Sequence, residues 1–309
     1  MAERIALIYQ GLTSHNAERY GQLRQNRTAN RWLQRADRAV PNIGLLERLT
    51  DPSAYLEPEF ASTANFAAAT AVTHTLFDST GAWQPSIVTG NSHGLIIAVN
   101  TARGYRSYED GLCFSQERGR LMGTVPGGVV VLSSNAEIAE KILQQVREET
   151  PLREGQEVFP THYNSPTQTV IGGSNELLSK VAEIAKVHGV KAHTGLVSPP
   201  SHTPLMEPIL DDIGKLVAPI VIDPGIPLVA NTDASVLESA EDIKEEFQQQ
   251  LIEPVNWIKG IRTIFESGVK TFVVIAPGSD SGAKMIQQIV PSADILIVGP
   301  GSLYRPNGK

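Results

Sequence analysis

The stretch "PSIVTGNSHGLIIAVNTARG", residues 85–104, holds Ser92 between two glycines, in the letters GNSHG. A short apolar run precedes the serine, and a longer apolar run of helical length follows it. Strand, G-x-S-x-G and helix in this order are typical of an elbow that exposes the serine hydroxyl on a sharp turn. The helix N-terminus would then face the serine and stabilise negative charge there. Ser92 is therefore either a nucleophile or a serine in an ordinary turn.

The segments around this stretch alternate between strand-like and helical patterns. Before it, "RIALIYQG" is an apolar run that ends at glycine and indicates a buried strand, and the alanine-rich segment that ends at Gly81 indicates a helix. After it, a helix is expected to stop near Gly123 and Pro126. Towards the C-terminus, "IPLVANT", two helical segments and "KTFVVIAPG" continue the alternation. Strands that alternate with helices predict an α/β fold with a parallel sheet and helices on both faces.

The middle of the chain differs from these flanks. Three strand-like segments, "GGVVVLSS", "PTQTVIGGS" and "VKAHTGLVS", are separated by two amphipathic helical segments. The order β-α-β-α-β predicts a compact α+β insert. We therefore expect a large domain of residues 1–126 and 198–309, interrupted by a small domain of residues 127–197, with the functional site between the two.

The composition of the 309 residues narrows the class of protein. Hydrophobic residues make up 41 % and charged residues 19 %, which is ordinary for a globular protein. The net charge of −7 argues against a broad nucleic-acid surface. The single cysteine, Cys113, excludes a disulfide framework and a multi-cysteine zinc site and fits a reducing compartment. With no apolar run near the ~18 residues that span a bilayer and no signal-peptide pattern at the N-terminus, we expect a cytoplasmic protein without a membrane partner.

A serine nucleophile needs a base, and histidine is the usual one. The seven histidines are His15, His74, His93, His162, His188, His193 and His202. His202 lies in the proline-rich loop "SPPSHTPLMEP", and a fixed loop is a good platform for a catalytic side chain. The side chain of His93 is expected to point away along the elbow, whereas its backbone N–H could be an oxyanion donor. Composition alone favours His202 only modestly over the other histidines as the base.

Seven blocks of the sequence follow the order of a known family: "GNSHG", "ERGRLM…VPGG", "YNSPTQTVIGG", "SHTPLMEP", "IPLVANT", "QQLIEPVNW" and "APGS". With these blocks the chain resembles, over nearly its whole length, the malonyl-CoA:acyl-carrier-protein transacylases and the acyltransferase domains of polyketide synthases. The resemblance implies an α/β-hydrolase-like large domain with an inserted ferredoxin-like small domain. It also implies acyl transfer from a coenzyme A thioester to the phosphopantetheine arm of an acyl carrier protein, in fatty-acid or polyketide biosynthesis, without a metal or a tightly bound cofactor.

The resemblance implies a catalytic role for five positions. Ser92 would be the nucleophile and His202 its base. The backbone N–H of His93, with a second N–H near Gln10 or Gly11, would hold the oxyanion. An acyl-serine would form and then pass to a second thiol, which is ping-pong chemistry.

Three further positions would bind the substrate. Arg118 would pair with the free carboxylate of a malonyl group, because two N–H groups of a guanidinium meet two oxygens. Gln250 would lie near the same site, and Asn164 would line the cleft. Each has an ordinary alternative: Arg118 and Gln250 could lie on solvated helix faces, and Asn164 could start a turn.

Three departures from the family's pattern bear on the substrate. Asn91 replaces the usual histidine of G-H-S-x-G, and His93 stands where an apolar residue is usual, so its imidazole could narrow or polarise the acyl pocket. Ser201 stands where malonyl-specific members tend to have an aromatic residue, so a larger acyl chain could enter. An acyltransferase or acyl-thioester hydrolase for a non-malonyl group in polyketide biosynthesis is therefore the alternative function.

Overall fold

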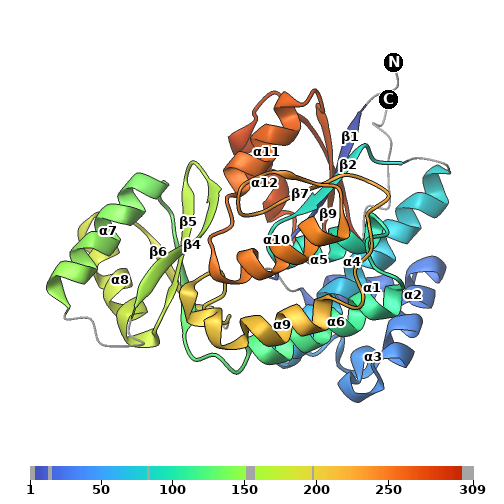
Figure 1. Ribbon diagram of the computed structural model, residues 1–309, viewed down its shortest axis with the longest axis horizontal. Helices are drawn as coiled ribbons and strands as arrows, with labels where there is room; N and C mark the ends of the chain where they lie inside the picture. Colours follow the sequence, from blue (N-terminus) through green and yellow to red (C-terminus); the bar gives the residue numbers. More distant parts are fainter. Residues whose placement is uncertain (1–3, 13–15, 82–83, 151–156, 197, 301–309) are drawn as a thin grey trace.

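The computed structural model describes residues 4–12, 16–81, 84–150, 157–196 and 198–300. Figure 1 shows a large unit built around one sheet and a smaller unit beside it, on the left of the view. In the described part of the chain, the large sheet has six strands in the order β10-β9-β1-β2-β7-β8. These strands are β1 (Ile5–Tyr9), β2 (Ile87–Gly90), β7 (Leu228–Val229), β8 (Val236–Leu237), β9 (Thr271–Ile275) and β10 (Asp294–Val298). Neighbouring strands pair in parallel, except β7 and β8.

Helices cover both faces of the large sheet, as the alternating pattern predicts. The helices of the large unit are α1 (Ala17–Leu23), α2 (Arg27–Ala39), α3 (Leu45–Arg48), α4 (Pro58–Thr80), α5 (His93–Thr101), α6 (Tyr108–Met122), α9 (Leu210–Val217), α10 (Ala240–Ile252), α11 (Trp257–Glu266) and α12 (Ser281–Ile289), with short 3-10 turns η1 (Pro41–Ile43), η2 (Pro52–Leu56) and η3 (Pro204–Ile209). Successive residues of a strand point to opposite faces. In β1, Leu7 and Tyr9 pack into the core that includes α4 and α5, whereas Ala6 and Ile8 pack with α11 and α12.

The small unit has one strand more than its sequence pattern predicts. Its elements are β3 (Gly128–Leu132), α7 (Ala136–Glu149), β4 (Val158–Ser165), β5 (Gln168–Gly173), α8 (Asn175–Val187) and β6 (Ala192–Leu196). The predicted order β-α-β-α-β was wrong because it omitted β4. This edge strand contains Pro160 and two register shifts, which interrupt the alternation that marks a strand. The observed order β-α-β-β-α-β is that of a ferredoxin-like unit, so the predicted fold class is confirmed, while the domain boundaries stay a prediction.

The free edge of β4 is paired with the large unit. The N–H of Tyr163 donates to the carbonyl of Val255 at 2.9 Å, and the N–H of Val255 donates to the carbonyl of Thr161 at 2.8 Å. His162 and Val255 thereby form a parallel β-bridge. An unpaired strand edge is a liability, and here the segment before α11 covers it and joins the two units.

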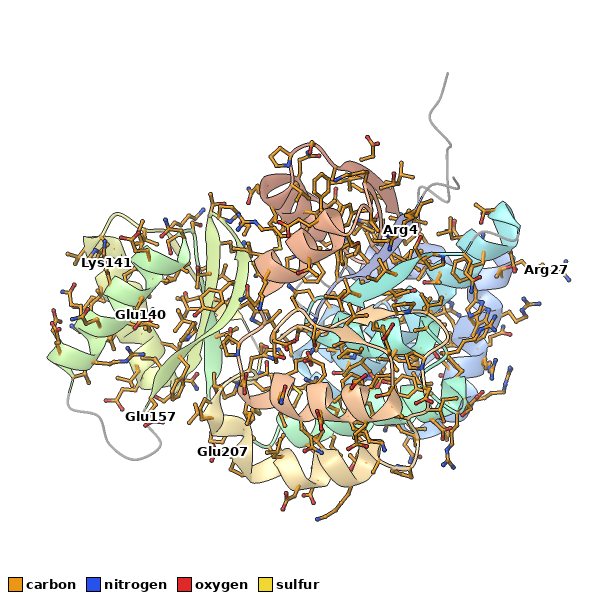
Figure 2. All side chains as sticks on the ribbon, turned by 45° about the horizontal axis from the view of Figure 1, so that its top comes forward. Arg4, Arg27, Glu140, Lys141, Glu157 and Glu207 are labelled. Atoms are coloured by element: carbon orange, nitrogen blue, oxygen red, sulfur yellow. The ribbon has the colours of Figure 1, made fainter. Side chains whose placement is uncertain are left out.

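Exposed charged side chains are found on the outside of both units. Figure 2 shows Glu140 and Lys141 on α7 and Glu207 in the turn before α9. Exposed ion pairs such as Lys141–Glu137 contribute little to stability, so each unit is stabilised mainly by its own apolar clusters. None of the helices in the described residues is long and apolar enough to cross a membrane.

Candidate active site

Ser92 lies on a sharp turn between β2 and α5, at the carboxyl end of the parallel sheet. Its backbone has φ 53° and ψ −118°, which L-residues rarely adopt. A Cβ atom at Gly90 would lie 2.1 Å from the backbone of Gly94, and one at Gly94 would lie 2.5 Å from the carbonyl oxygen of Tyr9. Only glycines permit these approaches, so both glycines of the motif are needed for the elbow to form against β1.

His202 reaches this serine from a loop that is 110 positions away in the sequence. Its Nε2 lies 2.7 Å from Ser92 Oγ, and its Nδ1 contacts the backbone carbonyl of Gln250. A carbonyl only accepts hydrogen bonds, so Nδ1 carries the proton and Nε2 presents its lone pair to the serine hydroxyl. The backbone N–H of His202 donates to the carbonyl of Leu251 at 2.9 Å, which fixes the loop on α10.

The surroundings of His202 keep its imidazole neutral. Burial lowers its pKa well below the usual value, and the neighbouring His162 and Arg118 lower it further, against a small opposing effect of the Gln250 carbonyl. His162 was given no role from the sequence, yet its ring packs edge-on to that of His202 with 4.7 Å between centroids. Burial lowers the pKa of His162 to about 4, so both imidazoles are uncharged at neutral pH.

A second serine–histidine hydrogen bond lies beneath the elbow. His93 Nε2 is 2.7 Å from Ser115 Oγ, and His93 Nδ1 is 3.1 Å from the amide nitrogen of Asn65. Both His93 and Ser115 are fully buried, and Ser115 donates to the carbonyl of Ser62, so this pair belongs to the packing between helices. The expectation that the His93 imidazole narrows the acyl pocket is therefore wrong, because the ring points away along the elbow. Its backbone N–H stays a predicted oxyanion donor.

Gln10 and Gly11 follow β1 and lie beside the elbow. A Cβ atom at Gly11 would be 3.0 Å from the carbonyl of Asn91 and 3.7 Å from Cβ of Ser92. The side chain of Gln10 turns towards the start of α12, where it accepts the N–H of Gly282 at 3.0 Å and contacts the carbonyl of Ser279. The side-chain amide is thus engaged, and an oxyanion donor from these two residues stays a prediction for the backbone.

Arg118 is buried within α6, because it shares a helix face with apolar and small residues. Only 1 % of Arg118 is exposed. Its hydrogen bond to Oε1 of Gln250 is long, at 3.5 Å, and no carboxylate of the described residues forms an ion pair with it. Burial lowers its pKa to about 10, so the guanidinium remains charged at neutral pH. A buried charge without a counter-ion is unfavourable, so a bound anion would stabilise the Arg118 guanidinium.

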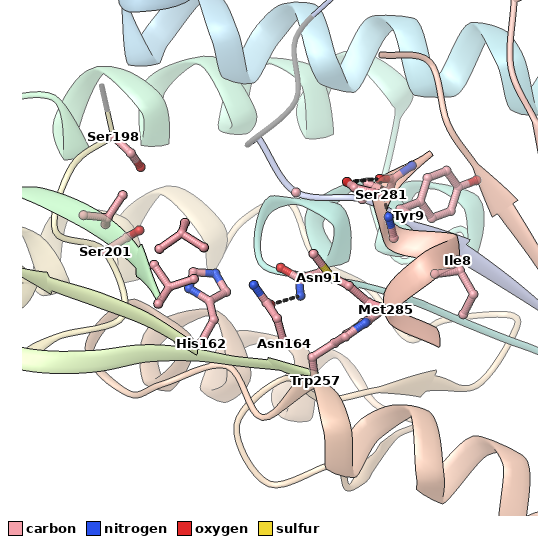
Figure 3. Close-up of a pocket in the computed structure, with 16 residues that line it drawn as sticks. Ile8, Tyr9, Asn91, His162, Asn164, Ser198, Ser201, Trp257, Ser281 and Met285 are labelled. Carbon is pink, nitrogen blue, oxygen red and sulfur yellow. Dashed lines mark hydrogen bonds between the residues drawn. The ribbon is translucent and has the colours of Figure 1, made fainter. Parts of the chain in front are cut away.

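Asn91 and Asn164 meet across the two units, at the wall of a pocket. Asn91 Nδ2 donates to Asn164 Oδ1 at 3.1 Å, as the dashed line in Figure 3 shows, and Asn164 Nδ2 donates to Oε1 of Gln168 at 2.9 Å. The pocket extends from Gly11 at the elbow to Ser201, next to His202. Its apolar walls are formed by Ile8, Val129, Val131, Val170, Trp257 and Met285.

Two residues of the site were missed by the sequence analysis. Asn231, after β7, accepts the N–H of Ser92 at 2.6 Å, and Glu246, on α10, accepts the backbone N–H of Asn231 at 2.7 Å. Gln250 lies one turn further along α10 and donates to Oδ1 of Asn231 at 3.1 Å. The spacing of Glu246 and Gln250 by four residues was the available signal, since it places both on one helix face.

The described residues hold no group of three or more His, Cys, Asp or Glu side chains that could bind a metal ion. The exposed Cys113 and the histidines His74, His188 and His193 lie outside the contacts of the elbow given above. His15 lies outside the described residues.

The chain belongs to the family of acyl transferase domains, whose model matches residues 22–298. It is similar to the malonyl CoA-acyl carrier protein transacylases of Salmonella typhimurium, 32 % identical over 201 residues, and of Escherichia coli strain K12, 30 % identical over 201 residues. Each alignment covers 64 % of this chain, and the chain spans 64 % of the length of each of these relatives.

Solved structures of such enzymes share the fold over almost the whole chain. The malonyl CoA-acyl carrier protein transacylase of Coxiella burnetii is 26 % identical, with a TM-score of 0.85 and coverage of 97 % of this chain and 96 % of that one. The acyl-carrier-protein S-malonyltransferase of Burkholderia pseudomallei is 25 % identical, with a TM-score of 0.87 and coverage of 97 % and 98 %.

Proposed function

We propose that this chain is an acyltransferase that moves a malonyl group from coenzyme A to an acyl carrier protein through an ester on Ser92. The observation that carries the proposal is the 2.7 Å contact between Ser92 Oγ and Nε2 of the buried, neutral His202. Membership of the acyl transferase family and the similarity to curated malonyl transacylases support it. Arg118 favours a malonyl group over uncharged acyl groups, because its buried charge has no counter-ion among the described residues.

The chemistry follows from the neutral Ser–His pair. His202 Nε2 takes the proton of Ser92 while the serine oxygen attacks the thioester carbonyl. Backbone N–H groups of His93 and of Gln10 or Gly11 stabilise the oxyanion, at about 3 kcal/mol for each donor. The C–S bond then breaks, and the leaving thiolate takes the proton back from His202. A second thiol attacks the malonyl-serine by the same steps in reverse, which restores Ser92.

An acyl carrier protein is the proposed receiver. A malonyl-transacylase whose likeness to this chain lies in the fold, with a TM-score of 0.85 at 24 % identity, has been solved in complex with the holo acyl-carrier protein of a type II polyketide synthase. In this chain, Lys259, Arg262 and Lys284 are exposed on α11 and α12, two helices that also contribute Trp257 and Met285 to the pocket. Exposed basic side chains on these two helices suit an acidic partner.

Intact-mass spectrometry tests the proposal. The purified protein is mixed with malonyl-CoA, acetyl-CoA or a longer acyl-CoA, and the adduct is followed before and after addition of a holo carrier protein. We expect a malonyl adduct that Ser92→Ala abolishes, that Arg118→Ala strongly reduces, and that the carrier protein removes. Arg120→Ala, which alters an exposed arginine of the same helix, is the matched control and should retain the adduct. Absence of any adduct on the wild-type protein would disprove the proposal.

A second candidate function is supported by the pocket itself. Ser201 is small, and the walls that Val129, Val131 and Val170 form are apolar, so a non-malonyl acyl chain could occupy this space. The corresponding activities are transfer of that acyl group or hydrolysis of its thioester. The same experiment separates them: an acetyl or longer adduct that Arg118→Ala leaves unchanged, or free acid released without a carrier protein, supports the second candidate.

A further inference from the structure

The side-chain carboxamide of Asn231 bonds to the strained turn at Ser92 from two sides. Asn231 accepts the N–H of Ser92 at 2.6 Å through Oδ1, and its Nδ2 donates to the carbonyl of Gly90 at 2.8 Å. These two groups belong to the peptide units on either side of Asn91, at the centre of the turn. A backbone conformation such as φ 53° at Ser92 persists only where its surroundings over-determine it.

The position of Asn231 explains why a side chain performs this role. Strands β2 and β7 pair in parallel at Val88 and Leu228, and the hydroxyl of Thr89 donates to the carbonyl of Val229 at 2.8 Å. Beyond that point the two chains diverge and no further ladder bond between these strands is formed in the described residues. A carboxamide carries one acceptor and donors in the geometry of a peptide group, so Asn231 continues the ladder by one step, into the elbow.

Asn231 is in turn held by a buried acid. Glu246 is 3 % exposed and accepts the backbone N–H of Asn231 at 2.7 Å and the hydroxyl of Thr232 at 2.7 Å, one through each carboxyl oxygen. Burial is unfavourable for the charged form of this acid and raises its pKa to about 7. Through these two bonds Glu246 anchors the segment of main chain that carries the Asn231 side chain.

Helix α10 connects both halves of the Ser–His pair. From one face, Glu246 holds Asn231, and Gln250 donates to Oδ1 of Asn231 at 3.1 Å and to the carbonyl of Ser92 at 3.3 Å. The backbone carbonyl of the same Gln250 contacts Nδ1 of His202. The helix therefore fixes the serine through side chains and the histidine through the main chain.

We propose that Asn231 and Glu246 are positioning residues that hold Ser92 Oγ at His202 Nε2. This inference rests on the proposed function of Ser92. Asn231 uses the N–H of Ser92, so that group is not available to the oxyanion, and the donors must come from His93 and from the end of β1. Asn231 is required for the serine to be reactive, and Glu246 is required for Asn231 to be in place.

A fluorophosphonate probe measures the reactivity of Ser92 without a malonyl group. The serine oxygen forms a bond to phosphorus, fluoride leaves, and His202 accepts the proton, so labelling reports the Ser–His pair alone. We expect Asn231→Ala to slow labelling about 100-fold, because a displacement near 1 Å has that effect on a reaction rate. Asn231→Asp should be slowed similarly, since it keeps the acceptor for Ser92 but sets a carboxylate oxygen against the carbonyl of Gly90.

Variants of Glu246 separate positioning from folding. Glu246→Gln keeps an acceptor for the N–H of Asn231 and a donor for Thr232, so we expect labelling within about threefold of wild type. Glu246→Ala removes both contacts and should slow labelling about tenfold or more. Glu245→Ala, which alters the exposed neighbour on the same helix, is the control. A residue with only a structural role would change the melting temperature but not the labelling rate of the folded fraction.

The outcomes distinguish the two claims. Slow labelling of Asn231→Ala, Asn231→Asp and Glu246→Ala, with near-normal Glu246→Gln and Glu245→Ala, supports the inference. If the variants of Asn231 do not fold, the labelling rates of Glu246→Ala and Glu246→Gln are compared instead. Equal labelling rates for these two variants overturn the inference. Wild-type rates in folded Asn231 variants overturn it as well, and leave the proposed function intact. A wild-type protein that neither the probe nor any acyl-CoA labels refutes the proposed function itself.

Discussion

Replacement of Arg118 by methionine should lower activity and raise stability at once. Methionine is about as long as the arginine stem and carries no charge. Burial lowers the pKa of Arg118 to about 10, and a shift of this size corresponds to roughly 3 kcal/mol of unfavourable free energy for the charged form in the folded protein. No carboxylate of the described residues pairs with Arg118 to offset this unfavourable free energy. Arg118→Met should therefore increase the free energy of unfolding at pH 7, by about 1–3 kcal/mol.

The effect on malonyl transfer should have the opposite sign. Loss of one partner of a buried, hydrogen-bonded charge pair costs about 2–5 kcal/mol, which is about 30-fold to 5,000-fold in kcat/KM for malonyl-CoA. Acylation by acetyl-CoA, which has no carboxylate to pair, should change far less. Rapid mixing with malonyl-CoA or acetyl-CoA, quenched at set times and read by intact-mass spectrometry, measures the acylation rate for each donor. Denaturant unfolding measures the free energy of unfolding.

An equal loss of acylation by both donors in Arg118→Met would show that Arg118 supports the site and does not bind a carboxylate. A variant less stable than the wild type would show that Arg118 has a counter-ion or a packing role in the free protein. Arg120→Met, on the exposed face of the same helix, should change neither quantity.

Three other predictions follow from the site. Gly94→Ala should lower the melting temperature and the labelling of the serine together, because the added Cβ would lie 2.5 Å from the carbonyl oxygen of Tyr9; normal values for both would contradict the packing described. The acylation rate should stay level as the pH falls through 6.5, because burial lowers the pKa of His202 and keeps the imidazole neutral; a decline centred at 6.5 in rapid-mixing measurements would show an exposed base. Lys259→Glu and Lys284→Glu should raise KM for an acidic carrier protein and weaken its dependence on salt, with acylation by malonyl-CoA unchanged; an equal effect on both half-reactions would argue against this surface.

Local patterns predicted the elements that carry strong periodicity. The apolar run of β1, the alanine-rich helix α4 and the order strand, G-x-S-x-G, helix all appear where the sequence indicates them. Strand β4 could not be predicted in this way, because it lies at an edge, contains Pro160 and is bulged twice, and so its side chains do not alternate.

In the candidate site too, features set by neighbouring residues could be predicted, whereas features set by contacts between distant segments could not. The direction of the His93 side chain followed from the geometry of an elbow, whereas the burial of Arg118 depends on α6 packing against other elements and reads in the sequence as a solvated charge. Asn231 follows a strand of two residues and stands 139 positions from Ser92. A short polar segment of this kind has the composition of a turn, so only the fold reveals its contact with the serine.

The backbone pairing of Val255 with β4 ties the small unit to the large unit beside the pocket, which His162 and Trp257 line. The two main-chain bonds beside His162 would have to break before the small sheet could swing away from α11. At this seam the distance between the two units is set by main-chain hydrogen bonds, which replacement of side chains alters little. Space for a bulkier thioester would then come from smaller side chains at pocket positions such as Met285, or from those already small, such as Ser201. Slow hydrogen exchange at the backbone amides of Tyr163 and Val255 would show that the two units stay paired.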